Sequence, residues 1–230
     1  MTDTISIPYL FLVLGIAPTF GVLSWTYLRQ NKRLPRKPKR YSLVIWAQIY
    51  LLLFTLGAAH AERIKLFPRK LPSGAAWILG SALLVALLMG VRHQWIRLDK
   101  DGRSRLGILL PLTQRELRWW IAVSVLAGVW EECAYRGAAY QLLLLLSHSV
   151  RVSLTACVIT FAVAHLYQGW KSAFVIGILG LLSHFAVFLT GGLYLSISVH
   201  TIYDVLIGWS AVRFLGESNA NKTGTPAVDE

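Results

Sequence analysis

The feature that most constrains this chain is a series of long apolar runs separated by polar linkers. A helix that crosses a bilayer needs about 20 mostly apolar residues. The mean hydropathy is +0.54, and only 15% of the residues are charged, whereas soluble domains carry about 25% charge. We therefore predict an all-α fold, a polytopic transmembrane helical bundle of about seven spans. The expected spans are roughly 6–28, 41–61, 74–91, 119–146, 153–169, 172–190 and 193–214.

Two of these spans carry local signals. Pro18 should bend the first, because proline cannot donate a backbone hydrogen bond inside a helix. The fourth run is longer than the hydrocarbon core requires, and Trp119 and Trp120 near its start suit the membrane interface. The segment just before it, 106–120, could form a short interfacial amphipathic helix.

The net charge of +12 is concentrated in linkers. Segment 29–40 holds seven Lys/Arg and no acid, and segment 92–118 holds seven against three acids. This is typical of the positive-inside bias and not of a nucleic-acid interface, so we expect contact with anionic lipid headgroups and no nucleic-acid partner. With both linkers in the cytoplasm, the N-terminus is outside and the C-terminus cytoplasmic. Linker 62–73, with four Lys/Arg, then falls outside.

The remaining composition excludes other classes. Cys133 and Cys157 both lie in apolar runs, so no disulfide framework is indicated. The N-terminus lacks a basic n-region and reads as a retained first helix.

Three regions are expected: N-terminal transmembrane helices with basic cytoplasmic linkers (1–118), a helical core that holds the buried charges (119–215) and a disordered polar tail (216–230). The compact length and small loops favour a bacterial inner-membrane protein.

The buried charges point to a function. Of eleven acidic residues, only Glu131, Glu132 and Asp204 fall inside expected spans, with Arg136 as the basic counterpart. On mild insertion scales each charge costs about 2.5–3.5 kcal/mol at the bilayer centre, and intramembrane ionisable groups are functional-site hypotheses by default. The other acids lie in linkers or tails: Asp3, Glu62, Asp99, Asp101, Glu116, Glu217, Asp229 and Glu230.

The spacing of these groups suggests a different role for each. Glu132 and Arg136 are four residues apart on a helix and can pair, whereas Glu131 is rotated by about 100° and stays free. His200 and Asp204 have the same spacing on the last span. With His165 on the fifth span, a free carboxylate and two imidazoles could activate water and donate protons.

Each group also has a structural interpretation. The Glu132–Arg136 pair could serve folding alone, and His184 reads as a satisfied core histidine. Cys133 touches the motif but reads as a small buried thiol on another helix face, not as a nucleophile.

At these residues the chain resembles the CPBP family of intramembrane proteases, also called the Abi or CAAX-protease-like family. The family pattern is E-E-x-x-x-R, then F-x-x-x-H, then H-x-x-x-N or D on later helices. Here it appears as "EECAYR" from Glu131, "FAVAH" ending at His165 and "HTIYD" from His200 to Asp204. Residues 119–214 carry the resemblance, and the first three spans carry no such signature.

The resemblance implies hydrolysis of a peptide bond in a membrane-associated or lipid-anchored protein or peptide substrate. Glu131 would activate water with the assistance of His165. Glu132 and Arg136 would hold Glu131 in position. His200 and Asp204 would polarise the scissile carbonyl. The eukaryotic prenyl-protein proteases of the family have Asn at the last position. Asp204 cannot donate a hydrogen bond unless protonated, so orienting His200 is its expected role.

Several alternatives stay open at this point. His165, His200 and Asp204 could instead bind zinc with Glu131 as base, although no H-E-x-x-H motif occurs; the resemblance favours the metal-free glutamate mechanism without a cofactor. A non-catalytic membrane scaffold, as in bacteriocin self-immunity, would have no use for an unpaired Glu131. A proton-coupled transporter would call for an inverted repeat, which we do not find. A peptidase that removes C-terminal sorting signals is a further possibility.

We expect Glu131, His165 and His200 to face one water-filled cavity below the membrane surface, reached from the cytoplasmic side.

Overall fold

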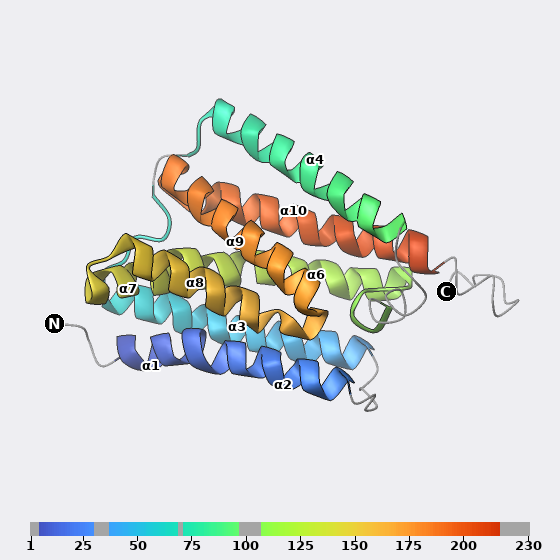
Figure 1. Cartoon of the computed structure of the whole chain (residues 1–230), viewed down its shortest axis with the longest axis horizontal. Helices are drawn as coiled ribbons and strands as arrows, with labels where there is room; N and C mark the ends of the chain where they lie inside the picture. Colours follow the sequence, from blue (N-terminus) through green and yellow to red (C-terminus); the bar gives the residue numbers. More distant parts are fainter. Residues whose placement is uncertain (1–4, 30–36, 69–70, 97–106, 217–230) are drawn as a thin grey trace, which may run out of the picture.

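The computed structural model describes residues 5–29, 37–68, 71–96 and 107–216, and within them every regular element is a helix. The all-helical prediction is therefore confirmed for this part of the chain. The long helices run side by side as a bundle (Figure 1). Of the expected disordered tail, 216–230, Gly216 belongs to the π-helical η4, and residues 217–230 lie outside the described residues.

Each expected span corresponds to a helix. The first is a continuous rod of α1 (Ser6–Phe11), the π-helical η1 (Leu12–Ile16) and α2 (Ala17–Arg29). It is followed by α3 (Lys37–Ala61) and α4 (Gly74–Ile96). The fourth is one long helix made of α6 (Gln114–Glu131), the π-helical η2 (Glu132–Ala139) and α7 (Tyr140–Ser147). The last three are α8 (Val150–Ala164), α9 (Trp170–Thr190) and α10 (Tyr194–Ala211), which η4 (Val212–Gly216) extends.

Within the described residues, four helices are long and apolar enough to cross a membrane: Ser6–Tyr27, Lys37–Ala61, Trp170–Thr190 and Tyr194–Leu215. The count of seven spans goes beyond this. The α8 helix has 15 residues, or about 22 Å at 1.5 Å per residue, which is shorter than the hydrocarbon core. The helix formed by α6 and η2 is long, but it carries the charged motif and is not among the four candidate spans. The chain is thus an integral membrane protein by its helices, and the three further crossings remain predictions.

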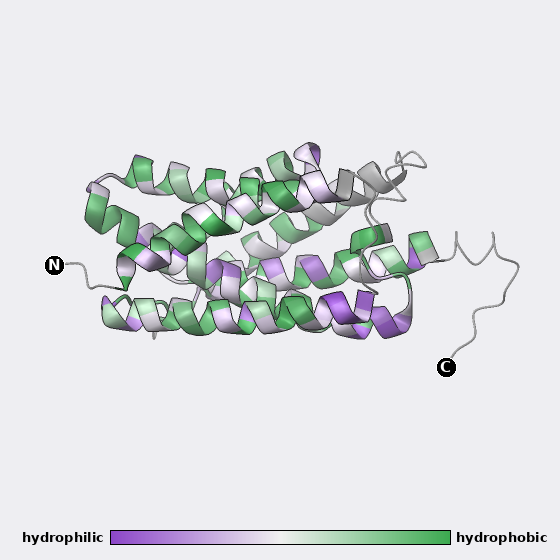
Figure 2. Ribbon diagram, turned by 90° about the horizontal axis from the view of Figure 1, so that it is seen from below, coloured by the Kyte–Doolittle hydropathy of each residue, from purple (hydrophilic) through white to green (hydrophobic). Residues whose placement is uncertain are grey.

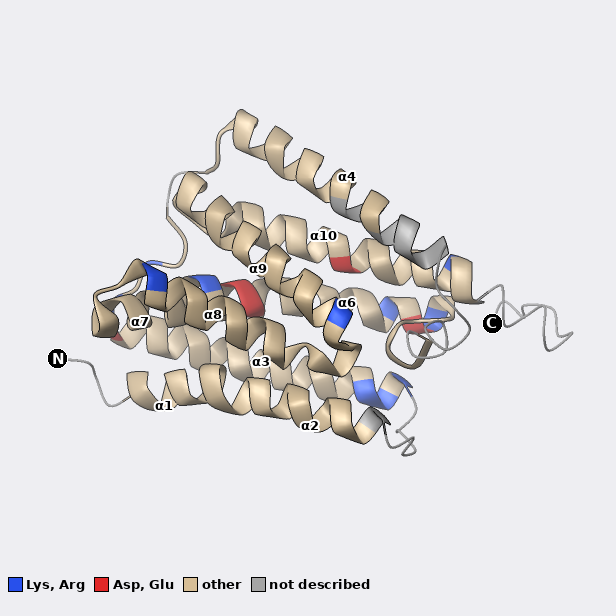
Figure 3. Ribbon diagram, viewed as in Figure 1, with Lys and Arg blue, Asp and Glu red and all other residues tan. Residues whose placement is uncertain are grey.

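The surface fits a lipid environment. Large apolar side chains point outward along the bundle, among them Ile78 at 71% exposure and Phe20 at 70%. Figure 2 shows this hydrophobic character along most helices. In Figure 3 most Lys and Arg lie toward the bundle's ends, whereas acidic residues also appear within it. Exposed apolar area of this extent marks a membrane or partner surface.

The expected amphipathic helix at 106–120 is wrong in detail. Within the described residues, 107–109 are helical, 110–113 are not, and α6 begins at Gln114. Pro111 interrupts the helix, because it lacks a backbone N–H. Thr113 then caps α6 by accepting from the Glu116 amide at 3.2 Å. Leu110 and its neighbours pack against the end of α10 near Ala211.

The core surrounds η2. Tyr135, Ala138 and Ala139 of η2 are buried together with Phe161 of α8 and Tyr9 of α1. Tyr135 donates its hydroxyl to the carbonyl of Val13 in η1 at 3.2 Å. The N-terminal helices, which carry no sequence signature, therefore support the segment that holds the charged motif.

On the other side, α6 packs closely against α10. Gly128 lies against Thr201, and Gly208 lies against Trp120, with no room for a Cβ at either glycine. Small residues at helix contacts allow such close approach in membranes. This contact places His200 and Asp204 of α10 beside the end of α6.

Candidate active site

The charged motif lies in a π-helical segment. Glu131 is the last residue of α6, and Glu132–Ala139 form η2. A π-helical turn replaces i→i+4 backbone bonds with i→i+5 bonds and is frequent at functional sites. Hydrophobic periodicity does not reveal it, and the sequence predicted an ordinary helix here.

Glu132 and Arg136 form the buried part of the site. Their side chains are 0% and 2% exposed, and Arg136 Nη1 lies 3.4 Å from Glu132 Oε1. His200 Nδ1 lies 2.9 Å from the same oxygen. Because a carboxylate only accepts, the Nδ1–H of His200 donates this bond. Glu132 thus orients His200 across the α6–α10 contact.

Arg136 lies in a tight socket that neighbouring helices form. Its guanidinium carbon lies 4.1 Å from the ring centroid of Phe161, a cation–π contact. On α9, a Cβ at Gly180 would come within 3.0 Å of Arg136 Nη2. His184, one turn further along α9, is buried and packs against Tyr140 in a tilted ring contact, with centroids 5.4 Å apart. The sequence reading of His184 as a core residue agrees with this packing.

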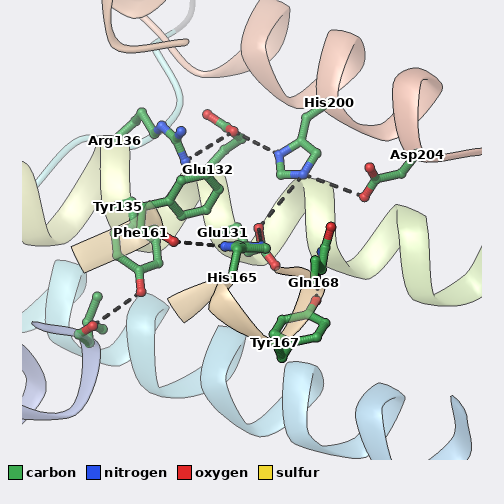
Figure 4. Close-up of polar contacts among 11 residues, drawn as sticks. Glu131, Glu132, Tyr135, Arg136, Phe161, His165, Tyr167, Gln168, His200 and Asp204 are labelled. Carbon is green, nitrogen blue, oxygen red and sulfur yellow. Dashed lines mark hydrogen bonds and ion pairs between the residues drawn. The ribbon is translucent and has the colours of Figure 1, made fainter. Parts of the chain in front are cut away.

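Glu131 faces the other way, toward two imidazoles. Its Oε2 lies 3.7 Å from His165 Nε2 and 3.8 Å from His200 Nε2. This buried oxygen has no hydrogen-bond partner within the described residues. The separations are too long for direct hydrogen bonds and suit one bridging water. Figure 4 shows the two histidines approaching Glu131 from separate helices.

His165 is held in one tautomer. Its Nδ1 lies 2.8 Å from the carbonyl oxygen of Phe161, which can only accept, so Nδ1 carries the proton. In the neutral ring, Nε2 is then an acceptor directed at Glu131. The ring also packs against Phe161, with centroids 4.6 Å apart.

Asp204 lies at the more exposed edge. Its Oδ2 is 3.6 Å from His200 Nε2, and its side chain is 27% exposed, compared with 16% for His200 and 12% for Glu131. Trp120 of α6 donates to the Asp204 carbonyl at 2.7 Å and so fixes this turn of α10. Trp120 thus has a specific structural role besides the interfacial one that the sequence suggested.

The structure brings all six predicted site residues together: Glu131, Glu132, Arg136, His165, His200 and Asp204. Cys133 does not join them. It is fully buried in the hydrophobic core with Tyr135 and Cys157. The expected convergence of Glu131 with both imidazoles is therefore seen in the geometry, whereas the cytoplasmic approach stays a prediction.

Sequence reasoning missed Tyr167 and Gln168. Both lie in the 3₁₀ turn η3 (Leu166–Gln168) directly after His165, and Gln168 Nε2 donates to the Tyr167 hydroxyl at 3.0 Å. Their closeness in sequence to His165 was a usable signal, because a turn that follows a site residue is often part of the site.

A zinc site would use His165, His200 and Asp204 as ligands. Within the described residues, no group of three or more His, Cys, Asp or Glu side chains is arranged to hold a metal ion. The Nε2 atoms of both histidines are instead directed at the Glu131 carboxylate. Zinc binding by His165, His200 and Asp204 therefore stays an alternative, and metal analysis of the purified protein tests it.

Comparison with known proteins gives one match. Residues 113–206 match the family model described as type II CAAX prenyl endopeptidase Rce1-like. This range spans α6 through most of α10 and contains all six site residues. No curated protein and no solved structure matches the chain.

Proposed function

Since residues 113–206 form a domain of the Rce1-like type II CAAX prenyl endopeptidase family, which is the CPBP or Abi family, we propose that this chain is an intramembrane endopeptidase. It hydrolyses a peptide bond in a membrane-associated or lipid-anchored substrate. Glu131 activates the water, and the mechanism is of the glutamic type.

One observation carries this proposal: a buried carboxylate oxygen without a partner faces two imidazoles. Glu131 Oε2 lies 3.7 Å from His165 Nε2 and 3.8 Å from His200 Nε2. An unpaired buried acceptor costs about 1–3 kcal/mol. Glu132 Oε2 also lacks a hydrogen-bond partner within the described residues, and what sets Glu131 apart is that its unpaired oxygen faces two imidazole nitrogens. The arrangement suits a general base that waits for water.

The chemistry follows from these positions. Glu131 takes a proton from water, the water oxygen bonds to the scissile carbonyl carbon, and the carbonyl π electrons move to its oxygen. Collapse of this intermediate breaks the C–N bond, and the protonated Glu131 returns the proton to the leaving nitrogen. His165 holds the water through Nε2.

The two paired residues support this step indirectly. Arg136 keeps Glu132 ionised, and Glu132 fixes the ring of His200 through Nδ1. His200 Nε2 therefore stays directed at Glu131 and Asp204. When His200 is protonated, Nε2–H can polarise the scissile carbonyl, and Asp204 orients that proton.

The substrate would enter from the side of Asp204. Side-chain exposure rises from 0% at Glu132 through 12% at Glu131 to 27% at Asp204. We propose that this edge opens toward the cytoplasm, with the N-terminus outside and residues 119–215 as the catalytic core. The basic linkers would contact anionic headgroups of a bacterial inner membrane.

A hydrolysis assay tests the proposal. The purified chain in liposomes of phosphatidylcholine and phosphatidylglycerol is given a peptide with a farnesylated cysteine, and separately a peptide with a C-terminal apolar anchor. We expect cleavage in ¹⁸O-water to place one heavy oxygen in the new carboxylate. Cleavage of only the second peptide would favour the sorting-signal peptidase. No cleavage of either would favour the non-catalytic scaffold.

A matched pair of variants separates the motif residues in this assay. Glu131→Gln should abolish cleavage, whereas Cys133→Ala, two residues further along the same helix, should retain it. Loss of cleavage in Cys133→Ala with normal folding would instead point to the thiol.

A further inference from the structure

The proposed reaction needs a hydrogen-bond donor at the carbonyl oxygen. Among the six motif residues, Arg136 is enclosed beside Glu132 and Phe161, and His200 can donate through Nε2 only when it is protonated. Negative charge develops on the carbonyl oxygen, and preorganised donors at that oxygen typically provide a large part of catalysis. The side chains of Glu131, Glu132 and Asp204 accept. The N–H of neutral His165 is used by the Phe161 carbonyl, and that of neutral His200 is used by Glu132.

Tyr167 lies where such a donor is needed. The imidazole of His165 is flanked by Phe161 at 4.6 Å and by Tyr167 at 5.9 Å between ring centroids, the latter pair with an interplanar angle of 30°. Figure 4 shows Tyr167 beside His165, with its hydroxyl directed toward Gln168 on the side of Asp204. The turn therefore brings a phenol next to the imidazole of His165.

The hydroxyl proton of Tyr167 is available. Gln168 Nε2 donates to the phenol oxygen at 3.0 Å, which occupies an acceptor position and leaves the O–H free to donate. Tyr167 lies in the turn between α8 and α9. A phenol ordinarily loses its proton only at about pH 10. The phenol therefore keeps its proton at neutral pH.

The backbone fixes this turn. The α8 helix ends at Ala164, and His165 donates its amide to the Ala162 carbonyl at 3.1 Å as the 3₁₀ turn begins. Gly169 then adopts φ +99°, a conformation that L-residues rarely take, and the chain reverses into α9. Tyr167 is thus held at a set position relative to His165.

We propose that Tyr167 is a catalytic residue that donates its hydroxyl hydrogen bond to the oxyanion of the tetrahedral intermediate, with Gln168 as the residue that positions it. This inference rests on the proposed peptidase function. The O–H bond of Tyr167 stays intact throughout. The electron pair that moves from the C=O π bond to oxygen is stabilised and returns when the C–N bond breaks.

The test is Tyr167→Phe, which keeps the ring against His165 and removes only the hydroxyl. We expect kcat for the farnesylated peptide to fall about 10²–10³-fold, the typical effect of one lost oxyanion donor. KM should stay within about threefold, because the bond forms only in the transition state. Gln168→Leu should lower kcat by a smaller factor, since the phenol remains but is less well oriented.

Tyr194→Phe is the matched control. Tyr194 of α10 donates its hydroxyl to the Pro68 carbonyl at 3.1 Å, away from the site. Its loss should lower the melting temperature and leave kcat unchanged. A Tyr167→Phe protein that keeps at least half of the wild-type kcat, or that loses activity only in proportion to folded protein, would overturn the inference. Wild-type protein that cleaves neither peptide would instead refute the proposed function on which it rests.

Discussion

Glu131 and Glu132 are neighbours in sequence but occupy opposite environments. Glu132 is fully buried and shares one oxygen between Arg136 at 3.4 Å and His200 at 2.9 Å. Glu131 is 12% exposed at its side chain, and its Oε2 has only the longer approaches of His165 and His200. One carboxylate is held in place, and the other is free to bind water.

His200 connects the two environments. Its Nδ1 is bound to Glu132, and its Nε2 faces Glu131 and Asp204. The Glu132–Arg136 pair therefore sets the orientation of the His200 ring, whose Nε2 faces the more exposed side of the site. His200 thus links the buried Glu132–Arg136 pair to the more exposed side of the site, so variants on the two sides should fail in different ways.

The largest expected effect is on the exposed side. Glu131→Gln removes the base but keeps the size and polarity of the side chain. We expect kcat to fall by about 10³-fold or more, since general acid–base catalysis typically contributes about 10²–10⁴-fold. The melting temperature in detergent should stay within a few degrees of wild type, because no partner of Glu131 is left unpaired. Substantial residual turnover would contradict the general-base role.

On the buried side, Arg136→Ala should lower stability as well as activity. Glu132 would lose the partner that keeps it ionised, and breaking one partner of a buried pair typically costs about 3–5 kcal/mol. Thermal unfolding in detergent measures this. The control is the double variant Glu132→Gln/Arg136→Met, which removes both charges and should recover much of the stability but not the activity. Wild-type stability in the single variant would show that the pair is not effectively buried.

A smaller effect is expected from the wall of the Arg136 socket. In Gly180→Ala the new Cβ would lie 3.0 Å from Arg136 Nη2 and 3.2 Å from Phe161 Cδ1. Crowding of this kind costs about 1–3 kcal/mol, and we expect kcat to fall as Phe161 shifts together with His165. Gly177→Ala, one turn earlier on α9, meets only the Cβ of Ala162 at 3.2 Å. It should lower stability by a similar amount and leave kcat per folded molecule unchanged. An equal loss of kcat in both variants would show that crowding of Arg136 and Phe161 is not the cause.

Much of this site could be predicted from the sequence, because its residues break the pattern around them. Charges in apolar runs are costly, so Glu131, Glu132 and Arg136 stood out, and i, i+4 spacing anticipated the contacts of Glu132 with Arg136 and of His200 with Asp204. The helix positions followed from the same apolar periodicity, to within a few residues.

Other features could not be predicted, for physical reasons. The π-helical turn of η2 depends on tertiary packing around Tyr135 and Phe161, which leaves no pattern in the apolar period. Rotation by 100° suggested that Glu131 points away from Glu132, whereas both reach His200, because that ring offers a nitrogen to each. Tyr167 could not be predicted, because tyrosine is common in turns and only its position beside His165 in the structure suggests a role.

The smallest expected effect is that of metal removal, and it separates the two mechanisms that share these residues. In the glutamic mechanism, Glu131 alone generates the nucleophile, and His165 and His200 direct their Nε2 atoms at its carboxylate. Incubation with 1,10-phenanthroline or EDTA, followed by removal of the chelator, should therefore leave kcat and KM within about twofold of untreated protein. A zinc-dependent enzyme would lose its activated water, and its activity would return on adding zinc. Recovery of that kind, with zinc bound at one equivalent and lost in His165→Ala, would replace the glutamate mechanism by a metal one.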